Sequence, residues 1–240
     1  MTKKVKAGIK VFLSIISIGM MSVAAKAGTT VNITKVKTSL FRHKLRKDLN
    51  DSSFAKEDNS FKHIDTRYRI AVSRLKEQAD ALRSYLSANN YNTDYCFLID
   101  MSIPSGKKRF FVYDLKNDRV LESAMVTHGI GSKINGSDED LKFSNDPSSL
   151  QTSLGRYRIG SSYTGNFGLA YKLYGLDATN SRAYERSVVL HAHSSIPTQE
   201  TYPIPIGESF GCPSVAPSFL STLTTYIKGS QKPVMMWIYN

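Results

Sequence analysis

From residue 96 to the C-terminus, the chain consists of short apolar runs separated by turn sequences, and this pattern constrains the fold more than any other feature. The runs are rich in β-branched and aromatic residues, and Gly, Pro, Asn or Asp residues separate them, as at 104–106 and 116–118. They occupy 96–103, 110–115, 119–127, 155–161, 168–174, 187–191 and 234–239. Short strands with few helices between them predict a mainly β fold, either a sandwich or a barrel.

Two helices are predicted to accompany the strands. Apolar residues recur at spacings of 3 and 4 between Tyr68 and Leu86, which places them on one face of an amphipathic helix over 67–90. A shorter helix, with Phe219, Leu220 and Leu223 on its apolar face, is expected to begin near Pro217. We expect the first helix to pack on a domain formed by residues 91–240.

The N-terminus has the three parts of a secretory signal peptide. Lys3, Lys4, Lys6 and Lys10 precede an uncharged, mostly apolar run over 11–25, and Ala25-Lys26-Ala27 forms a small-x-small exit site. The apolar run is shorter than the roughly 20 residues that cross a bilayer as a helix. We therefore expect residues 1–27 to be removed and the mature chain to be exported without an integral membrane segment; an uncleaved anchor is the alternative.

The excess of basic residues favours an anionic partner. The chain has 32 Lys+Arg and 20 Asp+Glu, a formal net charge of +12, and five of those lysines lie in the predicted signal peptide. Residues 28–66 are polar, and the stretch 35–47 holds several Lys and Arg residues and no acid. This segment is interpreted as a basic arm on an anionic surface or as a solvated linker.

The densest group of reactive residues lies between 188 and 215. A catalytic thiol needs a base, access to substrate and donors for an oxyanion. Cys212 could be such a nucleophile, with His191 or His193 as its base. Gly211 would let the backbone approach a substrate, and amides around Cys212 could face the oxyanion. Ser209 or a backbone carbonyl could orient the imidazole, and the helix that follows would stabilise a thiolate.

Less specific interpretations compete with this one. A lone cysteine is most often a small buried apolar residue. The chain has two cysteines, so one disulfide, Cys96–Cys212, is possible, and it would disable the site. The acidic residues at 138–140 are expected to lie in a solvated loop. No group of His, Cys and acidic residues has the spacing of metal ligands.

Segment 187–215 resembles the signature of the L,D-transpeptidase (YkuD-type) family, H-x(14–17)-[ST]-H-G-C. Ser209, Gly211 and Cys212 match its second half, and both His191 and His193 satisfy the spacing. The apolar strand before His191 favours it as the base. Residues 154–159 and 127–131 resemble a further strand and a Gly-bearing turn of the family, so the resemblance extends over about 95–240, closest to a divergent branch with H-x-H and Gly-Cys-Pro forms.

The resemblance implies the family's mainly β catalytic fold and its chemistry on peptidoglycan stem peptides, rather than nucleic acid binding. In that chemistry the Cys212 thiolate attacks the carbonyl of the third stem residue and expels the terminal D-alanine. The resulting thioester passes to an amine of a neighbouring stem and gives a 3–3 cross-link. No metal or cofactor is implied, and the place of work is the bacterial periplasm or cell wall.

Two departures from the signature leave alternatives open. Phe210 replaces the second histidine, and Ser214 stands where many members carry Arg. The residues that could hold the substrate are Arg156, Arg158, Tyr157, His128 and Phe210, with Arg182 and Arg186 as further cations for a carboxylate. An L,D-carboxypeptidase or another cysteine hydrolase of wall peptides would use the same residues. A non-catalytic wall-binding module is the second alternative.

Overall fold

The computed structural model describes residues 52–240, and residues 56–240 form one unit. The predicted signal peptide over 1–27 and the part of the predicted arm over 28–51 lie outside the described residues. Within residues 52–240, neither helix has the length and apolar character that crossing a bilayer requires.

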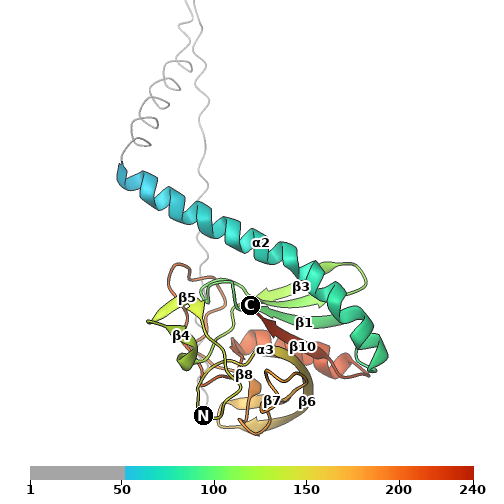
Figure 1. Ribbon diagram of the computed structural model, residues 1–240. Helices are drawn as coiled ribbons and strands as arrows, with labels where there is room; N and C mark the ends of the chain where they lie inside the picture. The colour runs from blue at the N-terminus through green and yellow to red at the C-terminus, as the bar shows by residue number, and fades with distance from the viewer. Residues whose placement is uncertain (1–51) are drawn as a thin grey trace, which may run out of the picture. The chain divides into compact units, whose positions relative to one another are not determined.

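Most strands belong to one mixed sheet in the order β3-β2-β1-β10-β6-β7-β8-β9. Their bounds are β1 Tyr95–Asp100, β2 Phe110–Asp114, β3 Arg119–Ala124, β6 Gly155–Gly165, β7 Gly168–Gly175, β8 Val189–Ala192, β9 Ser214–Val215 and β10 Met235–Tyr239. β1 pairs with β10 and β8 with β9 in parallel, and the other neighbours are antiparallel. The expected mainly β fold with an N-terminal helix and a later short helix is confirmed (Figure 1).

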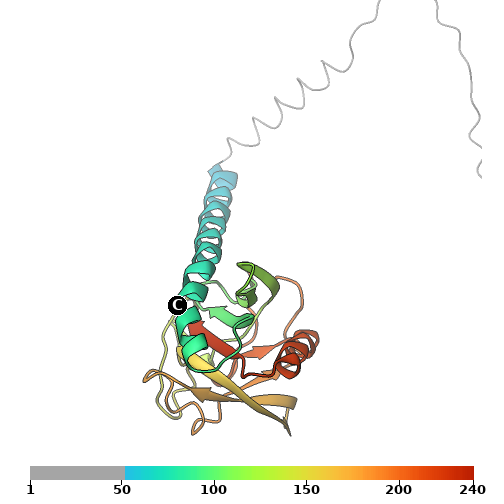
Figure 2. The ribbon, with the colours of Figure 1, turned by 90° about the vertical axis from the view of Figure 1, so that its right-hand side faces the viewer.

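The sheet buries a different apolar layer on each face. Along β1, Phe97 and Ile99 join a core that includes residues of β7, β8 and helix α3 (Pro217–Gly229). The alternate residues, Cys96 and Leu98, pack instead against helix α2 (Ser52–Ala88). Successive side chains of a strand point to opposite faces, so one strand serves both layers. Two views at right angles show α2 and α3 on opposite sides of the strands (Figures 1 and 2).

Helix α2 is longer than the sequence pattern indicates. It was expected over 67–90 and begins at Ser52, so residues 52–66, assigned to the polar arm, are helical. Polar residues at 56–60 interrupt the apolar spacing there, which hides the helix from a periodicity argument. The helix ends at Ala88, and Asn90 takes a left-handed φ of 59°, a conformation that Asn tolerates near helix ends. Its buried residues are Ala71, Leu75, Ala79, Leu82 and Leu86, and each leucine contributes about 1.5–3 kcal/mol through burial.

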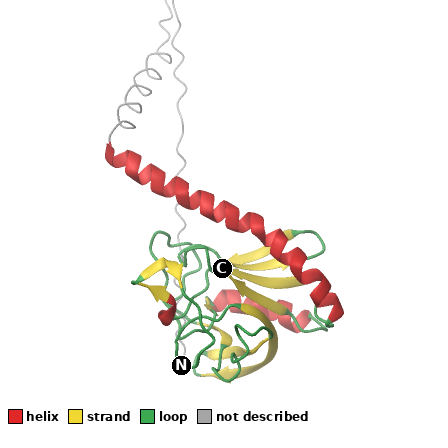
Figure 3. Cartoon of the chain, in the orientation of Figure 1, coloured by secondary structure: helices red, strands yellow, loops and turns green. Residues whose placement is uncertain are grey.

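A small hairpin corrects the prediction that residues 138–140 form a solvated loop. Strands β4 (Lys133–Ile134) and β5 (Ser137–Leu141) follow the 3-10 turn η1 (Ile130–Ser132). Asn135 and Gly136 connect the strands with φ values of 51° and 75°, as a two-residue hairpin turn requires. The Asn-Gly pair is a sequence signal for this hairpin, but the strands are too polar to alternate clearly. Loops gather beside β4 and β5 (Figure 3).

Candidate active site

Cys212 lies on the bend before β9, and the parallel pairing of β8 with β9 fixes its surroundings. His191 is the register partner of Ser214, which brings the residue two positions earlier, Cys212, beside Val189. The Val189 amide donates a hydrogen bond to Sγ over 3.4 Å, and the Ser187 carbonyl lies 3.8 Å from the sulfur. The half-buried thiol is therefore surrounded mainly by backbone polar groups.

Two hydroxyl groups hold the loop that carries the thiol. Ser209 Oγ donates to the Cys212 carbonyl over 2.6 Å and accepts the Gly211 amide over 3.1 Å. Thr127 Oγ1 lies 3.2 Å from the same carbonyl and accepts the Ser214 amide over 3.1 Å. Ser209 thus orients the Cys212 loop, whereas sequence reasoning had placed it beside the imidazole.

Gly211 is required by its backbone conformation and by close packing. Its φ is 114°, which side chains with a Cβ rarely adopt, and a Cβ would lie 2.8 Å from the Gln151 carbonyl oxygen. This backbone was expected to approach a substrate, whereas the close approach in the structure is to the loop around Gln151.

The two histidine rings line one cavity together with Cys212. Residues two apart on a strand share a face, and the rings of His191 and His193 lie 5.0 and 5.6 Å from the ring of Phe167. Phe167 sits at the tip of the β6–β7 hairpin and is 61% exposed. No sequence pattern placed Phe167 in the site, because an Asn-Phe pair between glycines indicates only a turn.

Hydrogen bonds define the tautomer of His191. Its Nδ1 lies 3.0 Å from the Ala192 carbonyl, which can only accept, so Nδ1 carries the proton of the neutral ring. Nε2 then has the lone pair, and Ser214 Oγ lies 2.8 Å from it. His193 is held differently, because its Nδ1 lies 2.6 Å from Ser195 Oγ. The backbone carbonyl is one of the two orienting groups expected from the sequence.

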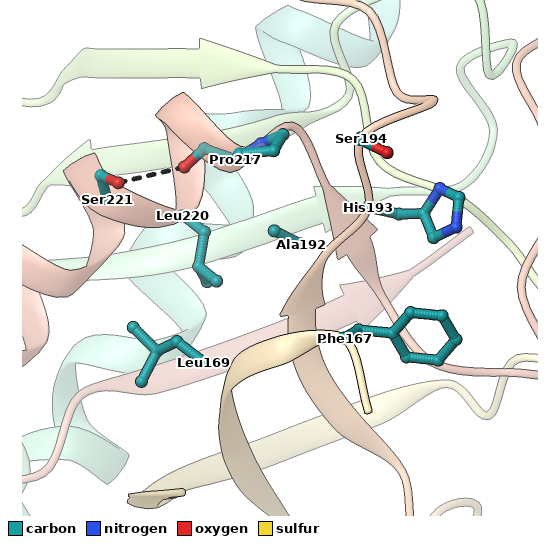
Figure 4. A pocket seen from close by; sticks show the side chains of 8 residues that line it. All are labelled: Phe167, Leu169, Ala192, His193, Ser194, Pro217, Leu220 and Ser221. Atoms are coloured by element: carbon teal, nitrogen blue, oxygen red, sulfur yellow. Dashed lines mark hydrogen bonds between the residues drawn. The ribbon is translucent and has the colours of Figure 1, made fainter. Parts of the chain in front are cut away.

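The cavity beside the thiol has a volume of about 330 Å³. It is lined by Thr127, Phe167, His191, His193, Ser195, Ile196, Gly207, Glu208, Ser209, Phe210, Cys212 and Ser214. Phe210, which is 77% exposed, is one of the lining residues, and its predicted role in substrate binding stays a prediction. A second cavity of about 420 Å³ shares Phe167 and His193 with the first and continues over Leu169 and Leu220 (Figure 4).

Burial keeps the resting site in its neutral form. It raises the pKa of the Cys212 thiol, although the Val189 amide and the positive charge of Arg186 oppose the shift. Burial also lowers the pKa of His191, partly offset by its bond to the Ala192 carbonyl. A protonated thiol and a neutral imidazole are the pair from which general-base catalysis starts.

His128 does not line the cavity, contrary to expectation. It is fully buried between Arg109, whose Nη2 lies 2.9 Å from Nδ1, and Asp138, whose Oδ1 lies 3.3 Å from Nε2. Arg109 is also fully buried and donates to the carbonyls of Val126 and Ile103. The His128 carbonyl accepts a hydrogen bond from the Ser209 amide, so the buried cluster is connected to the loop that carries Cys212.

The other residues expected to bind substrate also lie away from the cavity. Tyr157 is buried and its hydroxyl donates to the Ser153 carbonyl. Arg156 pairs with Asp177, and Arg158 lies over the ring of Tyr174 at 4.1 Å. These side chains belong to β6, whose register places them beside β10 rather than β8.

Near the thiol, the disulfide alternative is excluded and one expectation is corrected. Both cysteines are free and Cys96 is fully buried, with burial raising its pKa to about 12, so it forms no disulfide with Cys212. Helix α3 begins at Pro217, and β9 separates it from Cys212. The thiol therefore does not sit at the first turn of a helix. Among residues 52–240, no group of three or more His, Cys, Asp or Glu could hold a metal ion.

Solved structures with related folds share little sequence with this chain. Bd1075 from Bdellovibrio bacteriovorus is 17% identical with a TM-score of 0.38, and the match covers 61% of this chain and 48% of that one. The helical cell shape determining protein Pgp2 from Campylobacter jejuni is 14% identical with a TM-score of 0.40, covering 69% and 55%. An L,D-transpeptidase from Xylanimonas cellulosilytica is 15% identical with a TM-score of 0.33, covering 65% and 68%. The chain thus spans about half the length of the first two.

The family assignment rests on the sequence. No curated protein matches it. Residues 67–239, however, match the family model described as the L,D-transpeptidase catalytic domain, and this range includes the strands, helix α3 and every residue of the cavity. The chain therefore belongs to the L,D-transpeptidase catalytic domain family.

Proposed function

We propose that this protein is an exported peptidoglycan L,D-transpeptidase in which Cys212 is the nucleophile and His191 its base. The observation that carries the proposal is that a half-buried thiol and two imidazole rings line one cavity in a chain that belongs to this family. The place of work that we propose is the periplasm or cell wall, where a basic protein meets an anionic polymer.

The reaction proceeds through a thioester. The Cys212 proton passes to His191 as the sulfur attacks the carbonyl of the third residue of a donor stem. The amide bond to the terminal D-alanine breaks, and its amine takes the proton from the imidazolium. An acceptor amine then attacks the thioester, releases the thiol and forms the new amide bond.

His191 is the better base because its proton is fixed on the nitrogen that does not need to react. The Ala192 carbonyl accepts the proton of Nδ1, so the lone pair stays on Nε2. In the resting state the Ser214 hydroxyl donates its hydrogen bond to Nε2 of His191. Proton transfer therefore requires the Cys212 thiol to replace or pass this hydroxyl.

The amide of Cys212 is the proposed oxyanion donor. The Gly211 amide is bonded to Ser209 Oγ, whereas no hydrogen-bond partner of the Cys212 amide is found between residues 52 and 240. A backbone amide held by a rigid loop needs no reorganisation when charge develops on the substrate oxygen.

Incubation of the protein with muropeptides that carry tetrapeptide stems tests the proposal. We expect 3–3 linked dimers and free D-alanine from the wild-type protein, and neither from Cys212→Ser at an unchanged melting temperature. Cys96→Ala is the matched control, because it removes the buried thiol and should keep the activity. Free tripeptide without dimers would assign an L,D-carboxypeptidase, in which water takes the thioester. No reaction by a folded wild-type protein would favour a wall-binding module.

Replacement of each histidine tests the assignment of the base. His191→Gln should slow acylation of Cys212 by a carbapenem about 100-fold, the usual contribution of a general base. His193→Gln should slow it much less. Acylation is followed by the intact mass of the protein, and the reverse order of the two variants would transfer the role to His193.

A further inference from the structure

Arg186 is a cation without an acidic partner next to the proposed nucleophile. Its Nη1 donates to the Ser144 carbonyl over 2.7 Å and lies 3.1 Å from Ser153 Oγ. Its Nη2 donates to the Gln151 carbonyl over 2.6 Å and lies 3.4 Å from Ser149 Oγ. All four acceptors are neutral, and no carboxylate within residues 52–240 forms an ion pair with Arg186. Its charge is thus held in place but not neutralised.

The other arginines that the sequence offered for anion binding differ from Arg186. Arg156 is paired with Asp177, and Arg158 lies over an aromatic ring. Arg182 is half-exposed and lies within 3.9 Å of two carboxylates, those of Asp146 and Glu185. Only Arg186 among these four brings a fixed positive charge to the thiol loop.

Arg186 is close to Cys212 in two ways, through its guanidinium and through the chain that follows it. A Cβ on Gly211 would lie 3.3 Å from Arg186 Nη2, so the guanidinium touches the backbone immediately before the thiol. The chain that follows Arg186 supplies both backbone contacts of the sulfur, from Ser187 and Val189. Ser187 has a φ of 56°, a left-handed conformation that is unusual for serine and common at functional sites.

We propose that Arg186 is a positioning residue whose fixed charge favours the Cys212 thiolate over the thiol. The inference rests on the proposed function, since a thiolate is needed only if Cys212 is a nucleophile. Burial opposes ionisation of this thiol, and a nearby positive charge counteracts that effect. The released proton goes to His191, and Arg186 itself exchanges none.

Arg186 is not placed to bind a substrate carboxylate. A guanidinium has five N–H groups, and those of its two terminal nitrogens already face four acceptors. Its action is therefore electrostatic and passes through the sulfur. An ammonium at the same position would keep the charge but lose the fork of hydrogen bonds.

The pH dependence of Cys212 alkylation by iodoacetamide tests the inference on the full chain. The rate is measured by peptide mass mapping, which separates Cys212 from the buried Cys96. Arg186→Gln should raise the kinetic pKa of Cys212 by about one unit, a tenfold loss of thiolate below the pKa. Arg186→Lys should stay close to the wild-type value. If the two variants raise the pKa equally, Arg186 only braces the loop and the proposal is wrong.

A second experiment neutralises the charge of Arg186 while it keeps the arginine, and it includes a matched control variant. Ser149→Asp places a carboxylate beside Nη2 and should raise the kinetic pKa in the same direction as Arg186→Gln. Ser148→Asp adds the same charge at the neighbouring exposed position, where Arg186 makes no contact, and should have a smaller effect. Arg182→Gln controls for the loss of an arginine that already has acidic partners. Equal effects of all three would contradict the proposal.

The alkylation experiment does not depend on turnover. If muropeptides fail to react but the Arg186 variants shift the pKa, the charge acts on the thiol and the proposed reaction is wrong. If muropeptides react and the pKa does not move, the reaction stands and the role of Arg186 is wrong.

Discussion

His128 is buried beside Arg109, and its side chain fits this environment only when the imidazole is neutral. Arg109 Nη2 faces Nδ1 of His128, so the ring must accept there and carry its proton on Nε2, toward Asp138. Burial and the charge of Arg109 lower the pKa of His128 to about 4, against the opposing effect of Asp138. The cluster is thus built around a neutral imidazole.

The stability of the protein should therefore fall in mild acid. The pKa of His128 is 6.5 in the unfolded chain and about 4 in the folded protein. Between these two values the unfolded chain binds a proton at His128 and the folded protein does not. The free energy of unfolding should drop by about 3 kcal/mol across this window through His128 alone. His128→Gln, which can accept from Arg109 and donate to Asp138, should remove that part of the pH dependence. Denaturant titrations between pH 7 and 4.5 measure it.

An exposed histidine gives the control for this experiment. His193→Gln should leave the pH dependence of the wild-type protein nearly unchanged, since that ring is solvent-exposed. Parallel curves for the wild-type protein and His128→Gln would show that carboxylates, and not the buried imidazole, determine acid stability.

The β6–β7 hairpin is the element that covers the proposed base, His191. The two strands pair as far as Gly165 and Gly168, so the connecting residues are only Asn166 and Phe167. A tight turn of this kind holds Phe167 against His191, with the rings 23° from parallel. The ring thereby keeps water from one face of the imidazole and contributes to its burial.

Phe167→Ala should expose the ring of His191, the proposed base. The pKa of His191, which burial lowers, should rise toward 6.5, so the acid limb of the carbapenem acylation rate should move to higher pH. Because Phe167 lines the cavity in which we propose that the substrate binds, its truncation should also lower kcat/KM by about tenfold. Tyr163→Ala, on the same hairpin but outside the thiol cavity, should change neither quantity. An unchanged acid limb would mean that Phe167 does not control solvation of the ring.

Elements were easier to predict than the residues that complete the site. The main strands and helix α3 follow from runs of apolar residues that are local in sequence, and Cys212, His191 and His193 follow from their residue types and from the resemblance to the family signature. Phe167, Asp138 and Arg109 reach their positions through pairings between distant strands. No local pattern encodes such contacts. The start of α2 was missed because polar residues interrupt its apolar stripe.

The central sheet separates two tasks between its faces. Leu82 of α2 belongs to the layer on one face, and Leu223 of α3 belongs to the layer that includes β7 and β8. Both leucines are fully buried. Leu220 of α3 lines the second cavity, which shares Phe167 and His193 with the thiol cavity. The layer that includes α3 thus lies against the proposed active site, and the other layer attaches the long helix α2.

A matched pair of truncations should separate these tasks. Leu82→Ala and Leu223→Ala should each lower the free energy of unfolding by about 2–5 kcal/mol, because each leaves a cavity in a packed layer. Only Leu223→Ala should also slow carbapenem acylation of the folded protein severalfold, since α3 and β8 are in contact and Leu220 of the same helix lines the cavity beside His193. Denaturant titration and intact mass measure the two effects. Equal slowing by both variants would mean that α2 and its layer help to hold the site, so that the two faces act as one cooperative support for Cys212.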